Sequence, residues 1–186
     1  MSSTIARILK VNHGGEHGAI RIYAAQIAAA RLRCPSLTPE LADLLEHERR
    51  HERMFLALMP DRDARPCRLM WLWGIGGGVL GFSTGLLGRG AIFICTRAVE
   101  QTVHRHLTEQ LDWLASRPDR ADDAVAGAIR EIQAEEVGHL AWASDRAPGG
   151  AAAGALDGVI SWIVEALIWV STQGESARLH REIGRA

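Results

Sequence analysis

The chain has 186 residues, of which 47% are hydrophobic, and this is enough for one ordinary domain with a buried core. Its 21 basic and 22 acidic side chains give a formal net charge of -1, so a general polyanion binder is excluded and we expect no nucleic-acid partner. The three cysteines are far apart and form no CxxC pair, which argues against a disulfide framework and a cysteine-based zinc ribbon.

The spacing of proline, glycine and apolar residues predicts an all-helical chain. The first ten residues lack the apolar segment of a secretory signal, so we expect an intracellular protein in a reducing compartment. Helices are predicted over 4–33 (interrupted or bent near Gly14, Gly15 and Gly18), over 39–58 and over 89–115. A fourth helix follows the turn at 116–119 and runs to about 146, and a last helix covers 152–181. Turns separate them at Pro35, 59–61, 116–119 and 147–150. No segment alternates with a period of two, so no strand is expected.

Two segments are unusually apolar. Residues 69–87 carry no charged side chain, and a second apolar stretch covers 159–170. Four of the six tryptophans (Trp71, Trp73, Trp162 and Trp169) fall in these segments, and tryptophan favours the membrane interface. We therefore expect an apolar crossover at about 67–88 and an apolar C-terminal helix at about 152–181, both facing a membrane. The alternative is a buried core helix with an oligomer contact.

Two Glu-x-x-His units carry the chemistry. The first is Glu48 with His51, and the second is Glu136 with His139. At this spacing the two side chains lie one helical turn apart on the same face, so they can hold one metal ion together. Four-helix bundles that bind two metal ions use this unit twice and add one glutamate from each of the other two helices.

A further glutamate lies on the predicted helix that precedes each unit. Glu16 is the only acidic residue of the first helix, and Glu100 lies among apolar neighbours in the third. A buried charge needs a partner or a metal, and carboxylate and imidazole ligands suit iron or manganese. The sequence thus predicts a ferritin-like four-helix bundle.

If 69–87 crossed a bilayer, Glu48 and Glu100 would start on opposite sides, so we expect this segment to be a crossover that does not span.

Two other functions share parts of this pattern. Residues 47–51 read HERRH, which matches the HExxH helix of zinc proteases with Glu48 as general base. That assignment leaves Glu16, Glu100 and the second unit unexplained. A ferritin- or rubrerythrin-like protein for iron storage or peroxide scavenging would use the same ligands, but it needs no long exposed apolar segments.

The same residues resemble the demethoxyubiquinone hydroxylases, which are ferritin-like di-iron monooxygenases of ubiquinone biosynthesis. The resemblance covers about residues 6–171 and rests on Val11–Ala19 with Arg21, Ile22, Tyr23 and Gln26, on Glu48–His51 with Phe55, on Ala98–Glu100, and on Glu135–His139. It implies two iron ions, O2 as co-substrate, and hydroxylation of the ring of a demethoxy-polyprenyl-benzoquinol. The implied iron ligands are Glu16, Glu48, His51, Glu100, Glu136 and His139.

The resemblance also sets expectations for surroundings and partners. We expect one domain over 1–186 that lies peripherally on the cytoplasmic face of the bacterial inner membrane. The expected partner is a lipid-binding accessory protein or a ubiquinone-synthesis complex. Whether the chain forms an oligomer is left open. His104 and His106 are candidates for proton relay or for supporting the ligands, although each could be a solvated histidine. The chain departs from the family at Gly14, where alanine is usual, and at Leu107, where many members carry a tyrosine.

Overall fold

The computed structural model describes residues 4–117, 122–172 and 174–184. Within them every regular element is helical, so the all-α prediction is confirmed. The helices, in chain order, are α1 (Thr4–Arg33), η1 (Pro35–Leu37), α2 (Thr38–Leu58), η2 (Pro60–Arg62), α3 (Met70–Leu87), α4 (Arg89–Ser116), α5 (Asp123–Ser144), α6 (Ala151–Ser171) and α7 (Glu175–Ile183).

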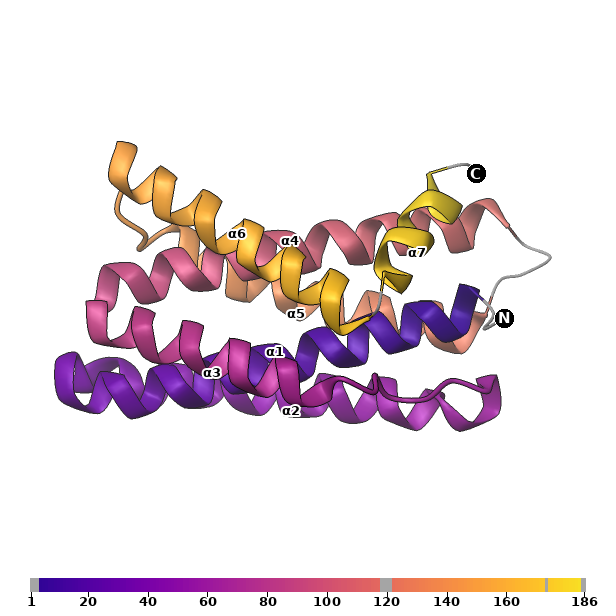
Figure 1. Ribbon diagram of the computed structural model, residues 1–186, viewed down its shortest axis with the longest axis horizontal. Helices are drawn as coiled ribbons and strands as arrows, with labels where there is room; N and C mark the ends of the chain where they lie inside the picture. Colours follow the sequence, from indigo (N-terminus) through magenta and orange to yellow (C-terminus); the bar gives the residue numbers. More distant parts are fainter. Residues whose placement is uncertain (1–3, 118–121, 173, 185–186) are drawn as a thin grey trace.

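Four long helices form the bundle that was expected. Helices α1 and α2 run antiparallel as one pair, and α4 and α5 run antiparallel as the second pair (Figure 1). Helix α3 packs along α1, opposite in direction to α2, and connects the first pair to the second. It is therefore the long crossover of a ferritin-like fold. Helix α6 crosses the bundle diagonally from the end of α5, and the short helix α7 packs on α1 and α4.

The apolar core lies on both sides of the middle of the bundle. On α2, Leu41 and Leu45 belong to one buried cluster and Phe55 belongs to the other. Glu48 and His51 lie between these clusters in sequence, and both are almost completely buried. Burying a charged carboxylate in such a place needs a compensating group. The core therefore leaves one polar segment at mid-bundle, where the site is found.

Glycines set how closely α3 approaches α1. A β-carbon at Gly77 would lie 2.7 Å from the backbone oxygen of Gly18, and one at Gly18 would lie 2.6 Å from the ring of Trp73. The sequence predicted that α1 is interrupted or bent at its glycines; the interruption is wrong, because α1 runs as one helix from Thr4 to Arg33. Gly14 and Gly18 instead leave room for the buried ring of Trp73.

Most helix boundaries fall within a few residues of their predictions. The prediction of a single last helix over 152–181 is wrong, because α6 ends at Ser171 and α7 begins at Glu175. Between them Gly174 adopts a left-handed backbone with φ 76°, which glycine reaches without strain. Part of the turn expected at 116–119, namely Pro118 and Asp119, lies outside the described residues.

Candidate metal centre

The fold brings together all six residues singled out as metal ligands. Glu16 comes from α1, Glu100 from α4, and the two Glu-x-x-His units from α2 and α5. They form two overlapping groups, each with ligand atoms within 4.8 Å of one another: Glu16, Glu48, His51 and Glu136 in the first, and Glu48, Glu100, Glu136 and His139 in the second. Every member is buried.

The distances show how the two groups share their members. His51 Nδ1 lies 3.0 Å from Glu136 Oε1 and 3.8 Å from carboxylate oxygens of Glu16 and Glu48. His139 Nδ1 lies 2.9 Å from Glu136 Oε2, 3.3 Å from Glu48 Oε1 and 3.9 Å from Glu100 Oε1. Both imidazoles therefore turn Nδ1 towards the carboxylates. Glu48 and Glu136 lie between the groups, as ligands shared by two ions must.

The electrostatics of the cluster show that its carboxylates repel one another. Burial, followed by the neighbouring Glu48 and Glu136, raises the pKa of Glu16 well above its usual range. Burial and the same two carboxylates likewise raise the pKa of Glu100. Burial alone would lower the pKa of His51 and His139, but the adjoining Glu136 and Glu48 raise them to about 11 and about 9. Contacts with both histidines hold the pKa of Glu136 low, although burial opposes this.

The donor set fits a pair of metal ions. Glu48 Oε1, Glu136 Oε1 and His51 Nδ1 are buried and make no hydrogen bond of normal geometry within the described part of the chain, although they face the same space. Four carboxylates and two imidazoles are hard to intermediate ligands that suit iron or manganese. The three cysteines are buried as free thiols outside these groups, so thiolate ligation plays no part in either of them.

A second layer of contacts was missed from the sequence. His47 Nδ1 lies 2.9 Å from His139 Nε2, and Glu135 Oε2 lies 3.1 Å from His51 Nε2. Tyr23 donates a 2.6 Å hydrogen bond to Glu100, and burial together with Glu100 raises the pKa of this tyrosine well above 10. Glu135 and Tyr23 stood within recognised motifs, yet no local pattern pairs residues so distant along the chain.

The HExxH alternative does not agree with this geometry. A zinc protease would hold one ion with both histidines of the motif. Here His51 turns Nδ1 to Glu136, whereas His47 contacts the outer nitrogen of His139 and belongs to neither ligand group.

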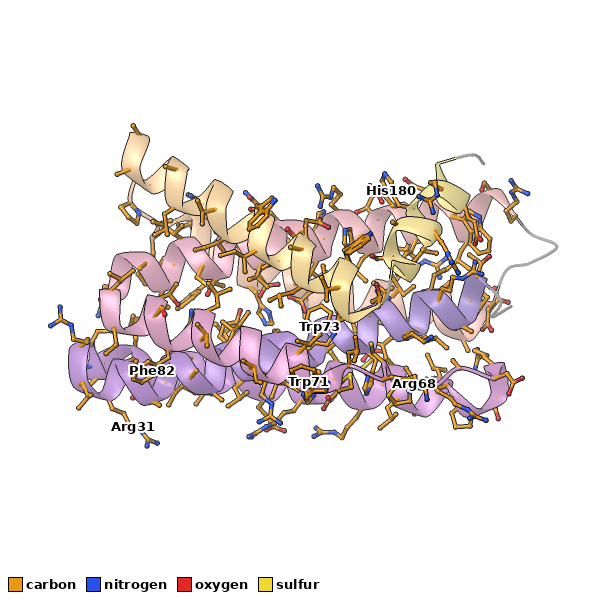
Figure 2. All side chains as sticks on the ribbon, in the orientation of Figure 1. Arg31, Arg68, Trp71, Trp73, Phe82 and His180 are labelled. Atoms are coloured by element: carbon orange, nitrogen blue, oxygen red, sulfur yellow. The ribbon has the colours of Figure 1, made fainter. Side chains whose placement is uncertain are left out.

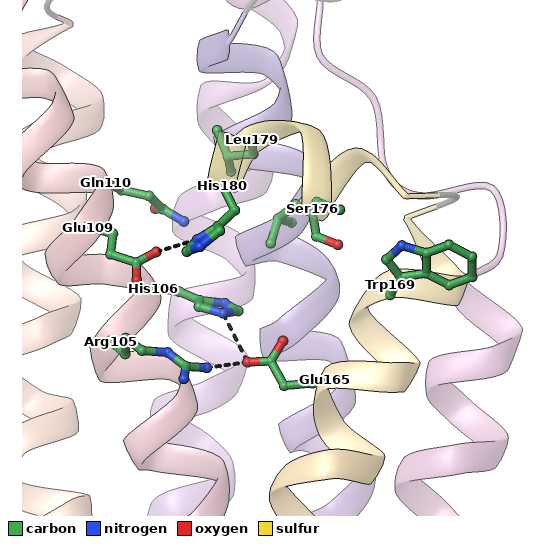
Figure 3. Close-up of a pocket in the computed structure, with 11 residues that line it drawn as sticks. Arg105, His106, Glu109, Gln110, Glu165, Trp169, Ser176, Leu179 and His180 are labelled. Atoms are coloured by element: carbon green, nitrogen blue, oxygen red, sulfur yellow. Dashed lines mark hydrogen bonds and ion pairs between the residues drawn. The ribbon is translucent and has the colours of Figure 1, made fainter. Parts of the chain in front are cut away.

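The two histidines proposed for proton transfer lie outside the ligand groups. His106 lines a cavity of about 310 Å³ between α4, α6 and α7, and its Nε2 lies 3.3 Å from Glu165 Oε1 (Figure 3). Arg105 pairs with the same carboxylate, and His180 Nδ1 lies 3.1 Å from Glu109 at the far side of this cavity. His104 is half-buried, and its Nδ1 has no hydrogen-bond partner among the described residues. Leu107 is buried in the apolar core.

A four-helix bundle with a carboxylate–histidine cluster at its centre defines a ferritin-like protein with a site suited to two metal ions. Residues 3–171 match the family described as ubiquinone biosynthesis protein COQ7. The chain belongs to this COQ7 family.

Characterised relatives carry related names. The chain is 35% identical over 176 residues to the 3-demethoxyubiquinol 3-hydroxylase of Rhodospirillum rubrum, covering 91% of this chain and 78% of the relative. It is 34% identical over 137 residues to the mouse NADPH-dependent 3-demethoxyubiquinone 3-hydroxylase, and 31% identical over 145 residues to the Saccharomyces cerevisiae 5-demethoxyubiquinone hydroxylase. These matches cover 74% and 72% of this chain. The matched region spans 62% of the length of each of these two relatives.

Proposed function

We propose that this protein is a di-iron monooxygenase that hydroxylates the ring of a demethoxy-polyprenyl-benzoquinol in ubiquinone biosynthesis, with O2 as co-substrate. The observation that carries the proposal is the pair of overlapping carboxylate–histidine groups buried at the centre of a COQ7-family bundle. The six residues of these groups are the proposed iron ligands.

The residues of the chain divide the work of the centre. When bound, two iron ions supply the activation of O2 that organic side chains cannot provide. Glu48 and Glu136 would hold both ions, and Glu16 and Glu100 would each complete one side. The surrounding apolar core excludes water, which strengthens electrostatic interactions within the site. His106 and His104 are proposed to pass protons. His106 Nε2 would exchange protons with solvent in the cavity that this histidine lines.

A peripheral position on the membrane fits the exposed surface. Helices α3 and α6 are long and apolar enough to cross a bilayer, yet only 33% and 22% of their apolar windows are buried. Trp71 and Phe82 on α3 and Trp162 on α6 are exposed (Figure 2 labels the first two). Because α3 packs lengthwise on α1, we propose that it lies in the interface without spanning, on the cytoplasmic face of the bacterial inner membrane.

This surface also separates the proposed enzyme from iron storage. An iron-storage bundle has no need to expose large apolar side chains, whereas an enzyme with a polyprenyl substrate must reach the membrane that contains it. We propose that residues 1–186 act as one unit on that membrane. A lipid-binding accessory protein or a ubiquinone-synthesis complex is the proposed partner.

The direct test combines metal content with product analysis. Purified protein should contain two irons per chain and convert a demethoxyquinol to its hydroxylated product when O2 and a reductant are supplied. Glu136→Ala should lose both iron and product. Glu46→Ala should retain both, because Glu46 is exposed on α2 and lies outside the ligand groups. Bound iron that is oxidised without any hydroxylated product would overturn the proposal in favour of storage.

A further inference from the structure

The two histidines of the centre occupy equivalent places in the sequence, but their outer nitrogens meet different chemical groups. His51 Nε2 faces a carboxylate oxygen of Glu135 at 3.1 Å. His139 Nε2 faces His47 Nδ1 at 2.9 Å, and the two rings stack with centroids 5.2 Å apart. One ligand histidine is thus supported by an acid and the other by an imidazole.

The direction of these hydrogen bonds follows from the ligand geometry. A neutral histidine that binds a metal through Nδ1 keeps its proton on Nε2 and donates it outwards. Glu135 would accept from His51, and His47 Nδ1 would accept from His139. A hydrogen bond to a carboxylate is stronger than one between neutral groups, and it makes the donating imidazole a more basic ligand. Arg50 pairs with the same Glu135 oxygen and holds the carboxylate in place, although as a donor it also reduces the electron density that this oxygen offers to His51.

The terminal carboxylates differ in the same direction. Glu100, on the His139 side, receives the 2.6 Å hydrogen bond from Tyr23. A donor on a carboxylate draws electron density away from the oxygen that would bind a metal. Each terminal carboxylate lies at a similar distance from the histidine of its own side, 3.8 Å for Glu16 and His51 Nδ1 and 3.9 Å for Glu100 and His139 Nδ1, so the tyrosine donor on Glu100 is what distinguishes them. Both differences make the His51 side the more electron-rich half.

We propose that the two metal positions are inequivalent, and that the position held by His51 and Glu16 binds its ion more tightly than the position held by His139 and Glu100. Glu135 and His47 are the positioning residues that set this difference. The inference rests on the two-ion centre of the proposed function, and it adds an order of occupancy that the repeated Glu-x-x-His motif does not contain.

The experiment is an anaerobic Fe(II) titration of the metal-free protein by calorimetry, with Mössbauer spectra of the protein loaded with ⁵⁷Fe. Wild type should bind in two resolved steps and give two quadrupole doublets of equal area when full. Glu135→Gln should weaken the tighter step by about 10- to 100-fold, which is the usual effect of losing such a support. His47→Leu should weaken the looser step instead, and His47→Gln, which keeps an acceptor, should restore it.

A matched control and three contrary results make the test decisive. Glu131→Gln removes an exposed carboxylate one turn from Glu135 on α5 and should leave both steps unchanged. Two equal binding constants with one doublet in wild type would overturn the inequivalence while leaving the proposed function intact, as would equal weakening of both steps by Glu135→Gln. Failure of wild type to bind iron would overturn the proposed function as well. Circular dichroism would verify that each variant is folded.

Discussion

The backbone oxygen of Ile22 lies 2.2 Å from the point where a β-carbon of Gly81 would stand. Helix α3 therefore rests directly on the backbone of α1. Gly85 makes a similar approach, since its β-carbon would lie 2.6 Å from Ala29 Cβ. Because α1 also carries Glu16, this contact supports the helix that forms one side of the candidate metal centre.

Replacing Gly81 by alanine should destabilise the fold, because the two helix backbones would have to move apart. Such overpacking costs about 1–3 kcal/mol. Gly78 lies on the same helix, and no atom of the described residues lies within 4 Å of its β-carbon position, so Gly78→Ala should stabilise the fold by up to about 1 kcal/mol through helix propensity. Urea unfolding of both variants measures the difference. Equal effects of the two substitutions would show that α3 does not pack on α1 in this way.

Replacing Glu16 by glutamine should separate stability from metal binding. Burial and the neighbouring Glu48 and Glu136 raise the pKa of Glu16, so without metal this carboxyl group gains little from being ionised. We expect Glu16→Gln in chelator to unfold at a temperature no lower than wild type. Fe(II) at 100 times its Kd should stabilise wild type by about 2.7 kcal/mol. It should stabilise Glu16→Gln less, because this variant lacks one of the proposed ligands.

Thermal unfolding with chelator and with Fe(II) tests this expectation. Glu46→Ala is the control, because this exposed side chain contacts Arg49 and Arg53 and no member of the ligand groups. It should respond to Fe(II) as wild type does. A Glu16→Gln protein that is weaker in chelator yet stabilised fully by Fe(II) would contradict the ligand assignment.

Asp122 should contribute stability that depends on pH. Its side chain caps α5 by accepting from Val125 N at 3.1 Å, and it pairs with Arg62 at 2.6 Å. Hydrogen bonds from Arg62 lower the pKa of Asp122. The stability that Asp122 contributes is therefore complete above its unfolded-state pKa of about 3.9, and it is lost as the pH falls through the lower pKa of the folded state.

Two variants divide these roles of Asp122. Asp122→Asn keeps a capping oxygen and should cost about 0.5–1 kcal/mol at pH 7, with the difference from wild type shrinking as pH falls below about 3.9. Asp122→Ala also loses the cap, so it should cost about 1 kcal/mol more at every pH. Urea unfolding of the metal-free proteins between pH 3 and pH 7 measures both. A constant gap between wild type and Asp122→Asn would rule out the ion pair as its cause.

The exposed tryptophans of α3 and α6 should govern membrane binding. Trp71 and Trp162 are 59% and 71% exposed, and removing both should reduce binding to lipid vesicles at least several-fold, because each large apolar side chain transferred from water contributes about 1.5–3 kcal/mol. Flotation with vesicles measures the bound fraction. Val137→Ser removes an exposed apolar side chain of α5, away from α3 and α6, and should leave vesicle binding unchanged. Equal loss in both proteins would indicate nonspecific adsorption.

Much of the candidate centre was predictable from the sequence because its proposed ligands follow local rules. The i, i+3 spacing places Glu48 with His51 and Glu136 with His139 on single helix faces, whatever the rest of the fold does. Glu16 and Glu100, each on the helix preceding such a unit, completed the set by analogy with known bundles. Proline and glycine fixed most helix ends to within a few residues.

Only the tertiary structure decided what surrounds those proposed ligands. His47 meets His139, and Tyr23 meets Glu100, across 92 and 77 residues of chain, and such contacts depend on how the helices are shifted and rotated against one another. The glycines of α3, which in sequence indicate a weak helix, turn out to permit close contact with α1. Helical periodicity acts within one helix, whereas the packing of side chains between helices sets which residues support the metal centre.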